Sequence, residues 1–238
     1  LSLHDALPIS CYEMDAHLAK VDQSSLGTNW GAGDIMYADL DGDGKISNGT
    51  NKLGDTGDYR IIGNSTPRFK YGITLDAAWK GFDFSIFMQG IGKRDLWLDG
   101  CYFWGANGQG NEWQSTGFTE HWDFFRPEGD PLGANLDAYY PRVNFSGGRN
   151  TQVQTRYLQN GAYLRLKNVQ LGYTLPRVWT EKAGISSVRV YLSGDNLATI
   201  TSLSKIFDPE ATGSLAGTGS GKLYPLQRVI SVGVNINF

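Results

Sequence analysis

The sequence has no apolar run that reaches the roughly 18 residues needed for a transmembrane helix. It also lacks a basic excess: 21 Lys and Arg face 24 Asp and Glu, and the net charge is −3. The two cysteines are far apart and define no disulfide framework. Phosphate-binding glycine loops, G-x-S-x-G motifs and His/Cys clusters are missing as well. These absences argue against a helical membrane protein, a nucleic-acid binder and an enzyme.

Aromatic residues and glycine are abundant instead, at 13% of the chain and 31 residues respectively. Aromatic side chains favour pleated, half-buried surfaces, and glycine marks turns and bulges. The composition therefore indicates an all-β chain.

The last ten residues alternate between apolar and polar side chains, which predicts a strand with one apolar face. The apolar positions are Ile230, Val232, Val234, Ile236 and Phe238. A terminal strand that ends on Phe resembles the signal by which bacterial outer-membrane barrels are recognised by the barrel-assembly machinery. We therefore expect Val232, Val234, Ile236 and Phe238 to act as an assembly signal.

Similar alternation predicts five strands in all, over residues 68–79, 82–93, 163–175, 188–197 and 228–238. The connections are short, long, moderate and long in turn, with long loops at 94–162 and 198–227. Short periplasmic turns that alternate with long external loops are typical of a transmembrane barrel. The fold class that we predict is all-β: the antiparallel C-terminal part of a transmembrane β-barrel with long external loops.

Local details of these strands are also predictable. Lys80-Gly81 fits a two-residue hairpin turn, because Gly tolerates a positive φ. The strand at 163–175 changes phase, and a bulge near Lys167–Asn168 would switch its faces. The alternative is that Arg165 and Lys167 lie above the membrane, where alternation is not required. The 176–187 link has room for one helical turn.

The first residues differ in character from the remainder. Residues 1–9 resemble a translated sequencing adapter, so we expect the native protein to begin near Ser10 and give His4 no functional weight. Residues 10–67 are predicted as an external loop segment with an Asp/Gly-rich turn, and 68–238 as the C-terminal barrel strands. Five strands cannot close a bacterial barrel, so we expect the remaining strands outside this sequence.

Several motifs after residue 30, taken in order and spacing, resemble the C-terminal portion of SusC/RagA family TonB-linked outer-membrane transporters. They are Gly33-Asp34-Ile35, Asp39-Leu40-Asp41-Gly42-Asp43-Gly44-Lys45-Ile46, Gly63-Asn64-Ser65-Thr66-Pro67-Arg68-Phe69, Trp79-Lys80-Gly81-Phe82-Asp83, Tyr157-Leu158-Gln159-Asn160, Ser193-Gly194-Asp195-Asn196-Leu197, Asp208-Pro209-Glu210 and Tyr224-Pro225-Leu226.

The resemblance implies a TonB-dependent importer of oligosaccharides or peptides in the bacterial outer membrane. It implies a SusD-like surface lipoprotein as partner, lipid around the barrel, and coupling to the TonB system through an N-terminal plug outside this sequence. The resemblance does not imply catalysis, and this piece alone should not transport anything.

One acidic turn resembles the first half of a calcium loop. Asp39, Asp41 and Asp43 occupy alternate positions, Gly44 follows, and the Lys45 carbonyl stands at position seven. The Glu that would complete an EF-hand is absent. A bound Ca²⁺ and a tight turn held by Asp side chains are both open.

The 94–162 loop is rich in aromatic residues, including Trp97, Trp104, Trp113 and Trp122. These rings suit contacts with solute or with the lipoprotein lid. Alternatively, a long ordered loop needs a small core of its own, and Trp serves well there.

Two functions of other classes compete with the importer. A secreted β-sandwich that binds carbohydrate would bury its apolar strand faces against a second sheet. A polysaccharide hydrolase would need two carboxylates across a cleft, and the sequence singles out none.

Overall fold

The computed structural model describes residues 2–3, 14–50, 52–110, 115, 117–146, 148–212 and 223–238. The chain divides into two compact units. We name them the loop unit (Leu1–Ser65, Asp95–Gln159 and Thr212–Leu223) and the sheet unit (Thr66–Arg94, Asn160–Ala211 and Tyr224–Phe238).

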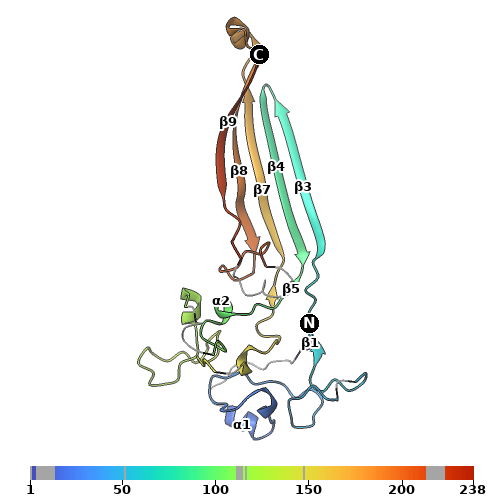
Figure 1. The fold of residues 1–238 in the computed structure, drawn as a ribbon, viewed down its shortest axis with the longest axis vertical. Helices are drawn as coiled ribbons and strands as arrows, with labels where there is room; N and C mark the ends of the chain where they lie inside the picture. The colour runs from blue at the N-terminus through green and yellow to red at the C-terminus, as the bar shows by residue number, and fades with distance from the viewer. Residues whose placement is uncertain are drawn as a thin grey trace. The chain divides into compact units, whose positions relative to one another are not determined.

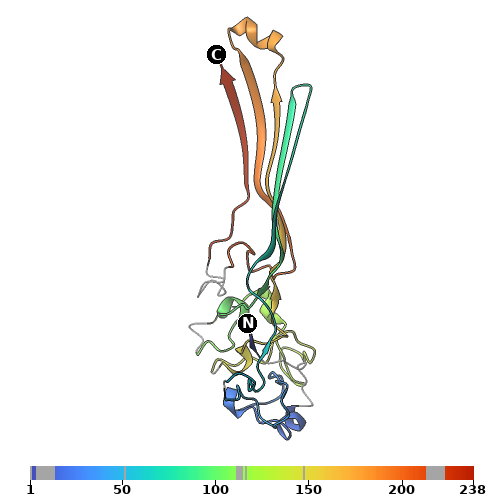
Figure 2. The same cartoon turned by 90° about the vertical axis from the view of Figure 1, so that its right-hand side faces the viewer.

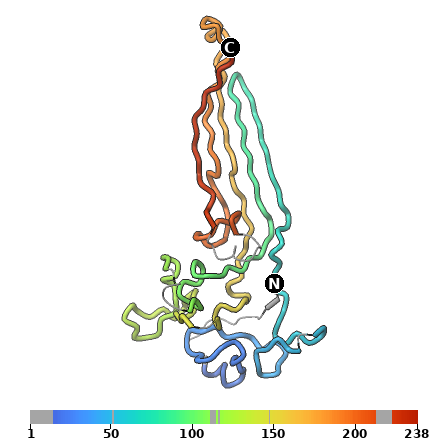
Figure 3. Tube along the Cα trace, viewed as in Figure 1, coloured from blue at the N-terminus to red at the C-terminus, as the bar shows by residue number. Residues whose placement is uncertain are grey.

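The sheet unit is built on five long antiparallel strands in the order β3-β4-β7-β8-β9 (Figures 1 and 3). Their bounds are Arg68–Trp79 for β3, Phe82–Lys93 for β4, Tyr163–Thr174 for β7, Ser187–Thr201 for β8 and Val229–Asn237 for β9. Each strand pairs with the next one in chain order, so the sheet is an antiparallel meander. The prediction of an all-β, antiparallel chain is confirmed.

The connection between β3 and β4 is a two-residue hairpin turn. Lys80 and Gly81 both have positive φ, 47° and 88°. Positive φ at both central positions matches the right-handed twist of the flanking strands, and it is easiest for Gly. The turn therefore has the predicted position.

A bulge interrupts β7 where the sequence changes phase. Phe87 of β4 pairs with Asn168 and Met88 pairs with Leu166, so Lys167 is an extra residue in the ladder. The register between β7 and β8 shifts at the same place. The predicted bulge is therefore present.

Strand β8 runs further than the sequence indicated, to Thr201 rather than to residue 197. Beyond the bulge, the segment from Ala198 to Thr201 pairs with the first residues of β7. Backbone pairing extends this strand past the point where its side-chain alternation ends.

The sheet has one apolar face and one polar face. Large side chains on the apolar face are strongly exposed: Val232 is 74% exposed, Ile230 69% and Leu75 56%. Other members with substantial exposure include Tyr71, Ile73, Trp79, Phe82, Phe84, Leu171, Val190, Leu192, Val234 and Ile236. The opposite parity carries Asp83, Gln89, Arg165 and Arg189. Two-sided alternation of this kind is what a lipid-facing sheet requires.

The remaining elements are short. The loop unit contains β1 (Ser2–Leu3), α1 (Met14–Leu18), η1 (Ser24–Leu26), β2 (Arg60–Ile61), β5 (Asp95–Leu96), α2 (Cys101–Trp104), η3 (Thr119–Trp122) and η4 (Arg149–Thr151). β6 (Gln159–Asn160) precedes β7, while α3 (Arg177–Thr180) and η5 (Glu181–Ala183) link β7 to β8, as one predicted helical turn. Among the described residues, no helix combines the length and apolarity needed to cross a membrane.

Buried polar groups tie distant segments of the loop unit together. Asp34 is fully buried, and its carboxylate accepts hydrogen bonds from Arg142 at 2.6 Å and from the Asn150 amide at 2.8 Å. The Tyr37 hydroxyl donates to the Arg149 carbonyl at 2.6 Å. A buried carboxylate is costly unless it is paired, so these bonds fix segment 34–37 against segment 142–150.

Candidate functional site on the polar face of the sheet

Two ion pairs hold the loop after β8 against β7. Arg165 contacts Asp208 at 2.7 Å, and Lys167 contacts Glu210 at 2.9 Å. The side chains of Arg165 and Asp208 are only 5% and 7% exposed. We call residues 202–211 the strap. Arg165 and Lys167, the charged residues that interrupt the apolar–polar alternation of β7, thus hold the strap on the polar face.

Asp208 is further held by the backbone. Its carboxylate accepts the amides of Glu210 at 2.9 Å and of Leu226 at 3.0 Å. Burial pushes the pKa of Asp208 upward, but the hydrogen bond from Arg165 and these two amides lower it overall. Asp208 is therefore ionised at neutral pH and holds both the strap and Leu226, in the segment before β9.

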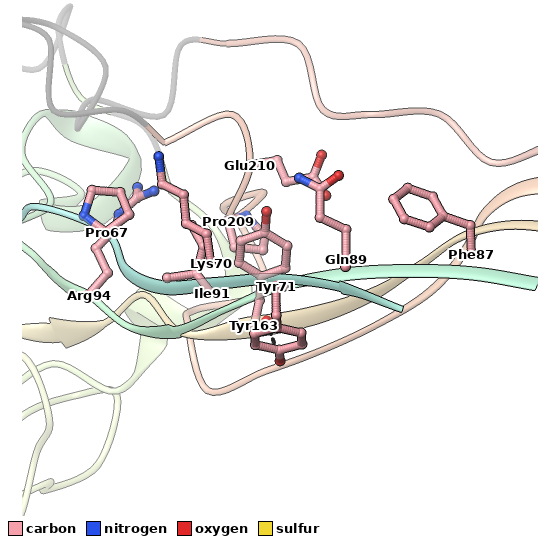
Figure 4. Close-up of a pocket in the computed structure, with 12 residues that line it drawn as sticks. Pro67, Lys70, Tyr71, Phe87, Gln89, Ile91, Arg94, Tyr163, Pro209 and Glu210 are labelled. Carbon is pink, nitrogen blue, oxygen red and sulfur yellow. Dashed lines mark hydrogen bonds between the residues drawn. The ribbon is translucent and has the colours of Figure 1, made fainter. Parts of the chain in front are cut away.

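A cavity of about 650 Å³ lies between the strap and the polar face of β3, β4 and β7 (Figure 4). Its lining combines the Lys70 ammonium, the Gln89 amide, the Glu210 carboxylate and the rings of Phe87 and Tyr163. In Figure 4 the Lys70, Gln89 and Phe87 side chains rise from the same side of the sheet, and Gln89 reaches toward Glu210. Apolar walls with a few polar groups of both signs suit an organic solute.

A second cavity of about 600 Å³ lies behind the strap, lined by Arg165, Thr199, Thr201 and strap residues. The Arg165 guanidinium donates from Nε to the Thr199 hydroxyl at 2.8 Å, and its Nη1 is buried without a hydrogen-bond partner. This arginine also lies 3.6 Å from the carboxylate of Glu210, which lines the first cavity.

Nearer the β3–β4 turn, another ion pair crosses the polar face. Arg189 of β8 donates from Nε to Asp83 of β4 at 2.9 Å, and both groups stay partly exposed. Gly172 of β7 lies beneath the pair. The polar face is thus charged along its length, as a surface toward water or a polar ligand requires.

The structure brings the three carboxylates of the acidic turn together, with ligand oxygens of Asp39, Asp41 and Asp43 within 4.8 Å of one another. Asp39 also accepts the amides of Gly42 and Gly44 at 2.6 and 2.8 Å. Hydrogen bonds of this kind, led by that from Gly44, lower the pKa of Asp39.

The rest of the acidic turn is compatible both with a bound Ca²⁺ and with a tight turn held by Asp side chains. The Asp43 amide lowers the pKa of Asp41, but burial and the charges of Asp43, Asp58 and Asp39 raise it overall. The Lys45 amide donates to Asp43 at 2.8 Å. Such mutual repulsion would be relieved by a cation, whereas the amide bonds suffice for a turn.

The tryptophans of the long loop have different environments. Trp104 is 2% exposed and packs against Trp97 and Tyr157, with ring centroids 5.7 and 4.8 Å away. Trp122 is 60% exposed and lies 5.7 Å from the Arg126 guanidinium. Trp113 lies outside the described residues. Trp104 is placed for a core role and Trp122 for a surface contact.

Three of the expected assembly-signal residues, Val232, Val234 and Ile236, lie on the apolar face of β9, and Phe238 directly follows the strand. Val232, Val234, Ile236 and Phe238 are 74%, 55%, 48% and 89% exposed. Their partners on β8 include Leu192 and Val190, directly opposite Val232 and Val234.

Sequence reasoning missed the strap and its cavity. The phase change at Arg165 and Lys167 was the available signal, but their partners lie 43 residues further along the chain. Lys70, Gln89 and Tyr163 looked like ordinary strand residues.

The known proteins that the chain resembles are TonB-dependent receptors and a peptide importer. No family model matches the chain. TonB-dependent receptor P3 of Formosa agariphila is 33% identical over 216 residues, and TonB-dependent receptor P26 of the same organism is 28% identical over 229. These matches cover 87% and 92% of the chain, and 19% and 21% of the receptors. The chain thus spans about a fifth of the length of the curated relatives it matches.

Solved structures agree in fold. The RagAB peptide transporter superposes over the whole chain with a TM-score of 0.65 at 25% identity, and the RagAB peptide importer in its open-open state with 0.66 at 23%. The chain covers 23% and 22% of those chains. The relatives are receptors and importers rather than enzymes, in agreement with the prediction that the chain is not an enzyme. The similarity confirms the prediction of part of an outer-membrane β-barrel.

Proposed function

We propose a function from one premise: the chain is part of a SusC/RagA-like TonB-dependent receptor of the bacterial outer membrane. The proposal is that the whole protein imports oligosaccharides or peptides, with the apolar face of the sheet toward lipid and the polar face toward the passing solute. The present chain supplies strands and external loops to that importer and does not transport alone.

One observation carries this proposal: the same sheet exposes a row of large apolar side chains and, on its other face, a polar cavity. Val232 and Leu75 are as exposed as a lipid-facing surface requires. Lys70, Gln89 and Glu210 line the cavity on the opposite side. A sandwich would bury the first surface, and a hydrolase would need paired carboxylates with room for a substrate.

The cavity suits either solute class. Tyr163 and Phe87 offer faces for a sugar ring or a peptide side chain. Lys70 and Glu210 can bind a carboxylate and an amine, while Gln89 can bind hydroxyls or a peptide amide.

The partners follow from the same premise. We propose a SusD-like lipoprotein at the external mouth, with Trp122 among the contacts to lid or solute. The TonB system would act through an N-terminal plug, and the assembly machinery would recognise the last strand ending at Phe238. The similarity to the RagAB peptide importer supports a paired lipoprotein.

The direct test is uptake by cells that carry the complete gene. Deleting the locus should abolish growth on the imported solute class, tested separately with peptides and with oligosaccharides as sole nutrient. Restoring the gene should restore growth, and a Glu210→Gln or Lys70→Met variant should lower uptake while leaving the receptor's abundance in the membrane unchanged. Normal growth of the deletion strain on both classes would overturn the proposal.

Long-read sequencing upstream of the Ser10 codon tests the proposed domain layout. We expect an open frame that continues into further strands, a plug and a signal peptide, and a neighbouring lipoprotein gene. A genuine start codon at residue 1 would contradict this layout.

A further inference from the structure

The link between β7 and β8 is a compact helical segment that exposes two large apolar side chains. Val178 is 68% exposed and Trp179 65%. The link lies at the same end of the sheet as the β3–β4 turn and the C-terminus (Figures 1 and 2). Two adjacent, exposed apolar side chains in a short link indicate contact with an apolar surface outside this chain.

The local hydrogen bonds fix this exposure. The Trp179 amide donates to the Pro176 carbonyl at 2.9 Å, and the Ile185 amide closes back onto the Thr180 carbonyl at 3.2 Å. Thr180 is 5% exposed, so the turn faces inward at that residue. Gly184, with φ of 72°, ends the segment. Val178 and Trp179 precede this buried residue within the same hydrogen-bonded segment.

The strands carry an apolar row at the same level. Trp79 pairs with Phe82, Phe82 with Tyr173, Tyr173 with Val190, and Val190 with Val234. The row thus crosses all five strands on the apolar face. The Phe82 and Tyr173 rings are 4.5 Å apart.

This row has the composition of an interfacial girdle, in which aromatic rings lie at the level of lipid headgroups. Trp179 follows the row member Tyr173 by six residues of chain. The link therefore directly follows, along the chain, the end of a strand whose apolar face is proposed to meet lipid. This position beside the aromatic end of the sheet favours lipid, rather than a periplasmic protein, as the occupant.

The charges of the link are compatible with this position. Arg177 pairs with Glu181 at 2.6 Å, which neutralises both at the edge of the segment. Lys182 is exposed and long enough to reach phosphate groups while its stem covers apolar surface.

We propose that α3 is a membrane-interface anchor, with Val178 and Trp179 inserted at the headgroup–acyl boundary of the phospholipid leaflet at that end of the barrel. The proposal rests on the proposed lipid-facing orientation of the sheet and adds a contact outside the strands. The anchor would fix the depth of β7 and β8 in the bilayer.

The test uses the receptor expressed from its complete gene and reconstituted in phospholipid vesicles with brominated acyl chains, which quench nearby tryptophans. Difference emission between the wild type and Trp179→Phe reports Trp179 alone. Trp79→Phe gives the same measurement for the strand girdle, and Trp122→Phe for a loop tryptophan that should not meet lipid. Heat-modifiable migration on gels confirms that each variant is folded.

We expect quenching of the Trp79 and Trp179 components and none of the Trp122 component. Quenching of Trp79 without Trp179 would overturn the anchor and leave the proposed function intact. Absence of quenching at both would overturn the lipid-facing orientation itself. Protection of Trp179 from both bromine and aqueous iodide, with Trp79 quenched, would assign α3 to a protein partner and also overturn the anchor.

Discussion

Arg189 of β8 reaches Asp83 of β4 across the intervening strand β7, passing directly over Gly172. A Cβ at Gly172 would lie 2.5 Å from both Arg189 Nη2 and Asp83 Oδ1. A side chain at this position would therefore displace the flexible ends of both partners, whereas the φ of Gly172 is not in the left-handed region and sets no demand for glycine. The ion pair spans three strands on the polar face, and it fits there because Gly172 has no side chain.

Gly172→Ala should push the ends of the Asp83 and Arg189 side chains aside and open their ion pair. Loss of a partly exposed ion pair costs about 0–1 kcal/mol, which should appear as a slightly lower unfolding temperature of the purified receptor. Gly117→Ala is the matched control, because a Cβ there meets nothing within 4 Å. Equal unfolding temperatures for the two variants would show that the glycine is not needed for the ion pair.

The strap should loosen in acid. The folded pKa of Asp208 lies below its ordinary value, so its contribution to stability is complete above a pH of about 4 and is lost as pH falls through the folded pKa. Protection factors for the amides of Glu210 and Leu226, which donate to Asp208, should fall in that window. In Asp208→Asn the protection should be low and independent of pH. A pH-independent wild type would contradict the assignment.

The acidic turn should survive removal of divalent cations. Asp39 and Asp43 already accept the amides of Gly42, Gly44 and Lys45, so saturating EDTA should leave the exchange rates of these amides unchanged. Faster exchange in EDTA, reversed by Ca²⁺, would favour the calcium alternative.

Asp58 is the structural support of that turn. It is fully buried and accepts the amides of Leu40 and Ser47, both at 2.7 Å. Asp58→Ala should leave both amides unsatisfied and destabilise the loop unit by about 1–3 kcal/mol for each. Asp130→Ala, which removes one exposed bond to the Leu132 amide, should have little effect in the same denaturation assay.

Substitution of two tryptophans in the long loop should lower stability in one case and binding in the other. Trp104→Ala removes a ring from the core and should cost about 3–5 kcal/mol of stability. Trp122→Ala should change stability by about 0.5 kcal/mol or less but weaken binding of lipoprotein or solute, measured with the purified receptor. A loss of stability in Trp122→Ala together with a loss of binding in Trp104→Ala would contradict these two assignments.

The strands were predictable because side chains that face lipid on one side and water on the other must alternate. The hairpin turn at Lys80-Gly81 and the bulge at Lys167 could also be read from local pattern. The end of β8 could not, since pairing with β7 rather than alternation sets it.

The site was less predictable because its contacts are distant in the chain. Arg165 and Lys167 stood out as charges in a strand, but nothing local indicated Asp208 and Glu210 as their partners. The loop unit is similar: Asp34 and Arg142 pair across 108 residues, and no periodic pattern encodes that contact.

The most direct test of the lipid-facing sheet is a spin-label scan along β9, from Val229 to Asn237, in the complete receptor reconstituted in lipid. We predict period-two accessibility: labels at 230, 232, 234 and 236 should be reached by dissolved oxygen, and labels at 231, 233, 235 and 237 by a water-soluble nickel reagent. Labels at the first set that neither reagent reaches would place that face against a second sheet and contradict the barrel.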